Sequence, residues 1–449
     1  MKIYDISINS KKTSAVFNPS IIRVGNNYLM ACHGFRRYDE DIVKEPVDSV
    51  HHANHPWYGG PESISWWTPT FEGFNGTYIF LLDSNLKVVK ELMELDDLID
   101  MRLFKNPDGQ IIATANKFVK EYVFGTDLDD EDDGINCLHE GCTAIVKGIV
   151  QLSSNYTVSN TEFKILCPFL STKTEKNWSY WFYRGQNYIS YMLTPKHVVF
   201  VETEEKKSLE PSRLPPLPKS AFEYFSDMNI ARVYGEMQKP VRSDAMKELG
   251  RMWRELSDEE REPFIQEEIK GKRVQASPKT MFNVCKVLIE RESSFLQYMS
   301  DFYEGELKFS LSTPAIPLGL RRWFGVGHGK LEYGVGKVEE LQNTPGSKFL
   351  RDNEDLKQHP NALYFMFLYT FDPESLEILE ISNCFFPPGA TIGIVFPAGL
   401  TTTSIGNFLI SYGEGDLKCK CMELTIAEVN GLLQKQTEFT GETYEFVRM

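Results

Sequence analysis

Short apolar segments, separated by loops that contain proline or glycine, recur along most of the chain. The segments are rich in β-branched and aromatic residues, which favour β-strands, and many are joined by turns such as Gly25-Asn26-Asn27. Five units of loop and hairpin begin near Asn18, Asp100, Asn177, Ser312 and Val395. This pattern predicts a mainly β protein, and its repetition favours a five-bladed β-propeller with one unit per blade.

Residues 214–275 interrupt the pattern, because their apolar positions recur at helical spacing. One stripe, at positions i, i+4, i+7, i+8 and i+11, is formed by Ala245, Leu249, Met252, Trp253 and Leu256. An earlier helix is expected around Phe222 and Phe225, and Ser257 with Glu260 forms a capping box that predicts the start of a third helix. The segment is therefore predicted to be a small three-helix domain.

This helical segment divides the β-rich chain into two parts. We expect blades one to three within residues 1–205 and the inserted helical domain within residues 206–277. A linking helix and blades four and five are expected within residues 278–449. The proline-rich residues 214–218 predict a stiff entry into the insertion.

Composition restricts the class of protein. The chain has 449 residues, of which 42% are hydrophobic and 25% charged, as in ordinary globular proteins. Its net charge of −15 excludes a protein that coats nucleic acid over its whole surface. No apolar run reaches the roughly 18–20 residues of a membrane helix, and residues 1–10 lack a signal-peptide pattern. Eight scattered cysteines indicate reduced thiols, so we expect an intracellular, cytoplasmic protein with no membrane partner.

Four loop motifs combine charged, aromatic and glycine residues: Asp100-Met101-Arg102, Glu175-Lys176-Asn177-Trp178, Gly325-Val326-Gly327-His328 and Ser411-Tyr412-Gly413-Glu414-Gly415-Asp416. Arg36 and Arg37 follow the first unit. At these motifs the chain resembles five-bladed β-propeller enzymes that act on glycosides, namely β-mannoside phosphorylases and mannosyltransferases of the same fold. The resemblance covers most of residues 15–200 and 305–425 and implies a glycosyltransferase or glycoside phosphorylase.

The resemblance implies that Asp100 is the catalytic acid, because glycosyl transfer needs a carboxylic acid to protonate the leaving oxygen. It also implies that Arg102 binds the sugar or phosphate. The motif of the family reads Asp-Pro-Arg, so Met101 departs from it and leaves the geometry of this loop open. A structural Asp–Arg pair at the entrance of the blade is the alternative.

The remaining motifs offer further substrate-binding candidates. Lys176 beside Asn177 could hold phosphate as a point charge, and the ring of Trp178 could stack on a sugar face. The alternative is aromatic packing between blades, with Lys176 at the surface.

His328 is a candidate phosphate or hydroxyl ligand, and a structural histidine is its alternative. Tyr412 and Asp416 match a sugar-binding segment by resemblance, although a tight turn would explain Asp416 equally well. Arg36 could hold an anionic group. The expected partner is an oligosaccharide or a sugar phosphate.

The helical insertion resembles an HMG box, the module that bends DNA from the minor groove. The wedge position of that family on the first helix is occupied by Glu223, and the second falls at about Arg242. Residues 214–273 hold 12 acidic and 11 basic residues, a net charge of −1, whereas phosphate contacts require a basic surface. We therefore expect weak or absent DNA binding, with Lys219, Ser220 and Arg242 as candidate contacts.

Three alternatives remain open at this point: a DNA-associated protein, a helical module that contacts another protein, and an inactive propeller with a structural role. An HMG box within such a propeller suggests a large DNA virus as the source, and hence the cytoplasm or nucleus of a host cell. His51, His52 and His55 share one loop, but no Cys or Asp completes a zinc site at a usual spacing. We expect no metal and no cofactor.

Overall fold

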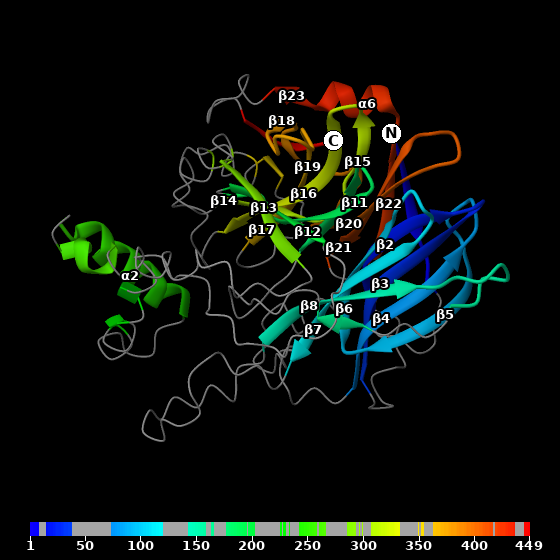
Figure 1. The fold of residues 1–449 in the computed structure, drawn as a ribbon, viewed down its shortest axis with the longest axis horizontal. Coiled ribbons are helices and arrows are strands. Elements are labelled where there is room, and N and C mark those ends of the chain that lie inside the picture. Colours follow the sequence, from blue (N-terminus) through cyan, green and yellow to red (C-terminus); the bar gives the residue numbers. More distant parts are fainter. Residues whose placement is uncertain are drawn as a thin grey trace.

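The computed structural model describes residues 1–8, 15–37, 73–119, 142–158, 163–165, 177–194, 196–202, 225–226, 228–229, 233, 242–257, 260–265, 285–292, 296, 299, 307–332, 349, 352–353, 362–415, 418–435 and 444–449. Most of these residues lie in strands, which confirms the predicted mainly β class. Figure 1 shows the strands gathered in one body. Within the described ranges, no helix is long and apolar enough to cross a membrane.

The described strands form five sheets. The first contains β2 (Ala15–Val24), β3 (Asn27–Arg37), β4 (Gly73–Leu82) and β5 (Val88–Asp96). The second contains β6 (Leu98–Lys105), β7 (Ile111–Val119), β8 (Cys142–Val150) and β9 (Lys164–Ile165). The third contains β10 (Ser179–Tyr183), β11 (Gln186–Met192), β12 (Lys196–Glu202) and β13 (Cys285–Glu292). In these three sheets neighbouring strands are antiparallel and follow one another in the sequence.

The fourth sheet is larger and contains β14 (Leu307–Leu311), β15 (Ile316–Gly319), β16 (Arg322–Glu332), β17 (Ala362–Phe371), β18 (Ile378–Ile381), β19 (Cys384–Phe386), β23 (Gln434–Lys435) and β24 (Phe446–Arg448). The fifth contains β1 (Lys2–Ile6), β20 (Val395–Thr402), β21 (Phe408–Glu414) and β22 (Lys418–Leu424). The first strand of the chain therefore completes the last sheet, where Tyr4 lies opposite Cys421.

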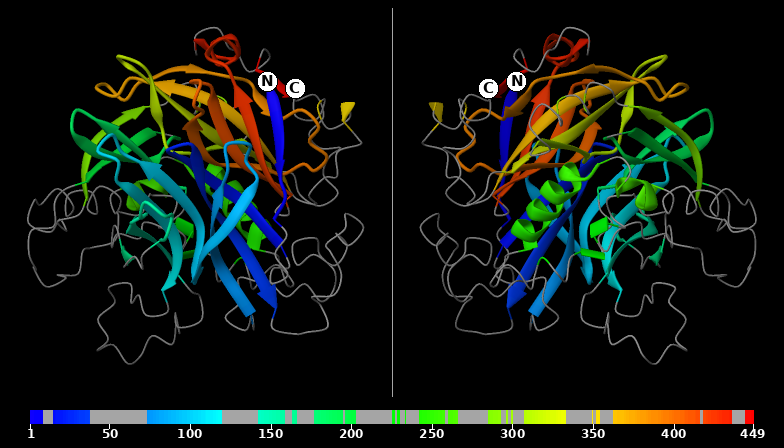
Figure 2. Two further views of the ribbon diagram at one scale, coloured as in Figure 1. Left: turned by 90° about the vertical axis from the view of Figure 1, so that its right-hand side faces the viewer. Right: turned by 90° about the vertical axis from the view of Figure 1, so that its left-hand side faces the viewer.

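Neighbouring sheets pack against each other in the order of the sequence. The first sheet contacts the second through β3 and β6, the second contacts the third through β6 and β10, and the third contacts the fourth through β11 and β14. The fourth contacts the fifth through β16 and β20, and β20 returns to β2 of the first. Figure 2 shows these sheets arranged around one another. The contacts close a cycle of five sheets.

Side chains between the sheets form the apolar core, because alternate residues of a buried strand point to opposite faces. The largest cluster joins the third, fourth and fifth sheets and includes Trp181, Phe324, Phe367 and Tyr412. Gly327 of β16 is needed for this packing, since an added Cβ would lie 2.4 Å from the ring of Phe367. The glycine thus lets an aromatic ring of the adjacent strand lie directly on the backbone.

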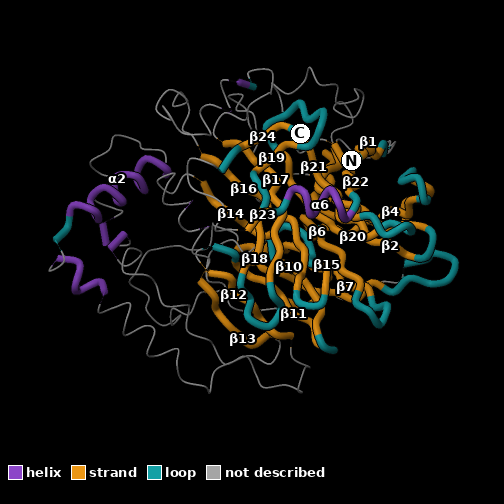
Figure 3. The backbone as a smooth tube through the Cα atoms, turned by 90° about the horizontal axis from the view of Figure 1, so that it is seen from above, coloured by secondary structure: helices purple, strands orange, loops and turns teal. Residues whose placement is uncertain are grey.

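The helical segment is partly described, and there it agrees with the sequence pattern. Helix α2 (Arg242–Glu255) contains most of the predicted apolar stripe, and Leu249 is fully buried. Phe225 and Phe264 lie in helical residues before and after α2, and both rings contact Trp253. Figure 3 shows α2 at one side of the strands. Whether this segment is an HMG box stays a prediction.

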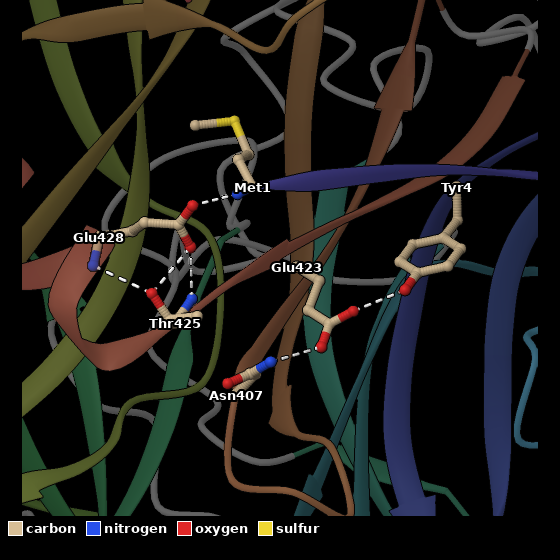
Figure 4. Close-up of polar contacts among 6 residues, drawn as sticks. All are labelled: Met1, Tyr4, Asn407, Glu423, Thr425 and Glu428. Carbon is tan, nitrogen blue, oxygen red and sulfur yellow. Dashed lines mark hydrogen bonds and ion pairs between the residues drawn. The ribbon is translucent and has the colours of Figure 1, made fainter.

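The predicted capping box is confirmed. The Ser257 backbone N–H donates to the Glu260 carboxylate at 2.8 Å, and the Glu260 N–H donates to the Ser257 hydroxyl at 3.3 Å. A second capping box starts α6 (Ile426–Leu432), with Thr425 as N-cap and Glu428 as its partner. Figure 4 shows that Glu428 also contacts the amino group of Met1, beside the hydrogen bonds that Glu423 accepts from Tyr4 and Asn407.

Candidate functional site

Six polar residues from three sheets are linked by hydrogen bonds and short contacts. We call them the polar cluster: Asn18 of β2, His33 of β3, Asp100 and Arg102 of β6, Ser312 after β14, and His328 of β16. The fifth sheet adds the ring of Phe396 on β20, which lies 4.7 Å from the ring of His328. Two of these residues, Asp100 and Arg102, belong to the loop motif that opens the second unit, and His328 comes from a motif more than 200 residues away.

Two irregular stretches of backbone place the first residues of the cluster. Asn18 and Asp100 both have left-handed backbones, with φ of 49° and 52°. Each lies where its strand slips in register against its neighbour, between Phe17 and Ser20 in β2 and between Ile99 and Arg102 in β6. Bulges of this kind redirect side chains and are common beside active sites. Asn and Asp tolerate the left-handed region best, which explains why these residue types start the units.

Asn18, Asp100 and His33 form one half of the cluster. The Asn18 side-chain amide donates to Asp100 Oδ1 at 3.0 Å, and His33 Nδ1 lies 3.6 Å from the same oxygen. Gly413 makes this arrangement possible, because a Cβ at that position would lie 2.3 Å from Asn18 Oδ1. The sequence motif around Tyr412 thus contributes space for Asn18.

Arg102, Ser312 and His328 form the other half. Arg102 Nε donates to the Ser312 carbonyl oxygen at 2.9 Å, and the Ser312 hydroxyl lies 2.7 Å from His328 Nδ1. Thr313 fixes the loop against β16, since its hydroxyl accepts from the Val326 N–H at 3.0 Å. Ser312 therefore links the arginine to the histidine.

Charges within the cluster hold Asp100 as an anion. Burial alone would raise the pKa of Asp100, but the interactions with His33, the charge of Arg102 and the hydrogen bond from Asn18 outweigh it. The pKa of this carboxyl therefore lies well below its ordinary value. A carboxylate in this state accepts hydrogen bonds and has no proton to donate.

The guanidinium of Arg102 has capacity for another partner. Arg102 is only 5% exposed, and its Nη1 donates to the Asp100 carbonyl oxygen at 2.9 Å. The central guanidinium carbon, Cζ, lies 5.3 Å from the centre of the Phe396 ring. Among the described residues, Nη2 is buried with no hydrogen-bond partner. Buried donors are nearly always bonded, so this nitrogen marks a place for an acceptor oxygen.

The structure describes three other predicted residues. Trp178 is 3% exposed and packs against Tyr191 and Phe200, with ring centres 5.3 and 5.6 Å away, which is the aromatic-packing alternative. Tyr412 is buried in the largest core cluster, and burial raises the pKa of its hydroxyl. Asn177 precedes Trp178 with a left-handed φ of 67°, as Asn18 and Asp100 have in their units.

Several candidates cannot be placed. Lys176, Asp416, Lys219 and Ser220 lie outside the described residues. Arg36 belongs to β3 and Arg242 begins α2, but their side chains are not described.

The sequence interpretation missed Asn18, His33 and Ser312. Asn18 and Ser312 each start a unit, as Asp100 does, so the repeat itself is a signal that could have revealed them. His33 lies within an apolar strand segment and is fully buried. A buried polar residue in such a strand needs a polar partner, but the sequence does not show that Asp100 is that partner.

No family model and no curated protein matches the sequence. Among solved structures, the chain is similar to a mannose phosphorylase from Leishmania mexicana in complex with phosphate ion, with 10% identity, 96% of this chain and 92% of that chain covered, and a TM-score of 0.40. It is also similar to a GDP-Man-dependent mannosyltransferase from Leishmania mexicana, with 10% identity, coverage of 95% and 90%, and a TM-score of 0.41. A putative glycosidase from Bacteroides thetaiotaomicron has 9% identity, coverage of 92% and 87%, and a TM-score of 0.45.

Proposed function

We propose that the five sheets are the blades of a five-bladed β-propeller and that the polar cluster is the active site of a carbohydrate-active enzyme. The reaction is the transfer of a glycosyl group, with mannose as the expected sugar, to a sugar hydroxyl or to phosphate. Residues 1–205 and 278–449 supply the blades, and residues 206–277 form an inserted HMG-box-like domain. The closed cycle of sheets and the five repeated units support this assignment.

The observation that carries the proposal is the buried Nη2 of Arg102, which lacks a partner in the described structure although the residue is 5% exposed. A guanidinium is always charged and its donors suit the oxygens of phosphate. Nearby Ser312 and His328 add a hydroxyl and a ring nitrogen to the same region. Arg102 is therefore the proposed ligand of phosphate or of a sugar phosphate.

Asp100 is the proposed catalytic carboxyl. It can act as an acid only while it is protonated. In the transfer, the bond from the anomeric carbon to the leaving oxygen breaks, a bond to the acceptor oxygen forms, and the leaving oxygen takes up a proton. The lowered pKa of Asp100 opposes proton donation while Arg102 is unoccupied. An anion bound by Arg102 would offset that charge and raise the pKa of Asp100, so phosphate binding would favour the acid form.

Activity is tested with sugar 1-phosphates and nucleotide sugars as donors and oligosaccharides as acceptors, and with phosphate as acceptor for mannosides. Released phosphate, nucleotide or sugar phosphate is measured for the wild type, Asp100→Asn and Arg102→Gln. Asparagine suits the left-handed backbone of Asp100, so this variant removes the carboxyl without straining the fold.

Asp97→Asn is the matched control, because Asp97 is exposed, also has a left-handed backbone with φ of 58°, and lies three residues from Asp100. We expect the control to keep full turnover. Absence of turnover by the wild type on the whole panel would contradict the proposal and favour the inactive propeller. Unchanged turnover in Asp100→Asn would remove Asp100 from the mechanism.

A further inference from the structure

A cavity lies toward the other end of two strands that carry residues of the polar cluster, β6 and β16. It has a volume of about 280 Å³ and is lined in part by Phe104, Lys105, Tyr183, Arg184, Pro317 and Trp323. Asp100 lies near the start of β6, whereas Phe104 and Lys105 end the same strand. On β16 the order is reversed, with Trp323 near the start and His328 further along. The two sites are therefore separate.

The walls of this cavity are mostly apolar and include aromatic rings. Phe104 and Trp323 are 6% and 7% exposed, so their rings are fixed by the surrounding core. The rings of Tyr183 and Trp323 meet edge to face with centres 5.2 Å apart. The Tyr183 hydroxyl is already engaged, because it donates to Glu374 at 2.6 Å. Such walls suit a flat apolar ring.

Two basic side chains border this cavity, and one of them is already paired with a carboxylate. Lys105 is exposed at the rim, and Arg184, which has a 72% exposed side chain, lies over the Tyr183 ring and pairs with Glu374. The Trp323 Nε1 is buried and has no hydrogen-bond partner within the described ranges. An indole nitrogen only donates, so a ligand that satisfies it must bring an acceptor.

We propose that this cavity binds a small organic anion with a flat aromatic ring. The ring lies among the aromatic walls, and the acidic group lies near Lys105 and Arg184. A sugar is a poorer occupant, because its several hydroxyls would lose water and find few partners among these side chains. The site differs in position and chemistry from the polar cluster and does not depend on glycosyl transfer.

Calorimetric titration of the full chain with 1-naphthyl phosphate tests this proposal. For a ligand of this size we expect a Kd of about 0.1 mM. The uncharged 1-naphthol and inorganic phosphate, which lacks the ring, should each bind at least about 5-fold more weakly at this site. Equal affinity for 1-naphthol would contradict the anionic ligand, and absence of saturable binding up to about 5 mM would overturn the site.

Variants assign the binding to this cavity. Lys105→Gln combined with Arg184→Gln should weaken 1-naphthyl phosphate about 10-fold, because two exposed charges are lost. Trp323→Phe replaces the indole by another aromatic ring that has no N–H donor, so about 5-fold weaker binding is expected. Lys90→Gln is the control, since Lys90 is an exposed lysine of β5 outside the lining.

Arg102→Gln separates this site from the polar cluster, because it removes the open guanidinium there. We expect that variant to bind 1-naphthyl phosphate as the wild type does. Loss of binding in Arg102→Gln with no change in the Lys105 and Arg184 double variant would overturn the proposal, since the probe would then occupy the polar cluster.

Discussion

Two buried polar groups of this chain, the polar cluster and the surroundings of His197, differ in how completely their hydrogen bonds are made. His197 is fully buried; its Nε2 lies 2.9 Å from the Ser190 hydroxyl, and its Nδ1 lies 3.0 Å from the Leu376 carbonyl oxygen. The Trp181 indole N–H donates to the same hydroxyl at 3.2 Å. Every ring nitrogen here has a partner, whereas Nη2 of Arg102 has no hydrogen-bond acceptor among the residues that the structure describes.

The hydrogen bonds of His197 assign its tautomer and its role. A carbonyl oxygen only accepts, so Nδ1 of His197 carries the proton and Nε2 accepts from Ser190. Burial lowers the pKa of His197 to about 4, with the hydrogen bond to Leu376 acting in the opposite direction. A neutral, fully bonded histidine stabilises the fold, while an incompletely bonded charged group has capacity left for a ligand.

The largest expected effect is on activity in the polar cluster. Asp100→Asn should lower kcat/KM by at least about 100-fold, because a positioned carboxyl contributes that much to proton transfer. Steady-state kinetics on the best substrate of the panel measures the change, beside Asp97→Asn. A loss below about 5-fold would show that Asp100 only supports the loop.

The next effect concerns stability at His197. His197→Leu should lower the free energy of unfolding by about 3 kcal/mol, because it removes the buried acceptor of the Ser190 hydroxyl and the buried donor to the Leu376 carbonyl oxygen. Urea unfolding at pH 7 measures the difference. Exposed Lys90→Gln should change the same quantity by less than about 0.5 kcal/mol. A similar small change for His197→Leu would remove the distinction between the two regions.

Acid should weaken the fold through the same histidine. The pKa of His197 is 6.5 in the unfolded chain and about 4 in the folded chain. Between these pH values the unfolded chain binds a proton at His197 and the folded chain does not. Stability is therefore present above the unfolded pKa and is lost as the pH falls, by about 2 kcal/mol between pH 7 and pH 5. Unfolding curves at both pH values should show a smaller loss for His197→Gln. An equal loss in the variant would assign the acid sensitivity to other groups.

The smallest expected effect is on stability at Arg102. Arg102→Met should lower the free energy of unfolding by about 1 kcal/mol, because relief from burying an incompletely paired charge offsets part of the loss of the hydrogen bonds to the Ser312 and Asp100 carbonyl oxygens. Thermal or urea unfolding of the variant measures this. A loss above about 3 kcal/mol would mean that Arg102 mainly holds the fold, as the structural Asp–Arg alternative proposes.

Local patterns predicted the local structure well. Strand segments, the apolar stripe of α2 and the capping box of Ser257 and Glu260 depend on residues a few positions apart. These features follow from spacing alone. The motif of Asp100 and Arg102 was found in another way, by its resemblance to the Asp-Pro-Arg motif of a known family.

The rest of the site could not be predicted, because its contacts join distant parts of the chain. Asn18 meets Asp100 across 82 residues, and Arg102 meets Ser312 across 210. The charge state of Asp100 also depends on His33, which nothing in the sequence places beside it. The sequence left two roles open for Trp178, and only the structure shows that its ring packs against Tyr191 and Phe200.

The pairing of β1 with β22 has a consequence for synthesis of the protein. Residues 2–6 pair with residues 419–423, so the first strand has no partner until residues 419–423 have left the ribosome. Contacts so distant in sequence slow folding, and the unpaired edges exposed meanwhile favour aggregation. A newly made chain therefore completes the fifth sheet only after β22 has been synthesised.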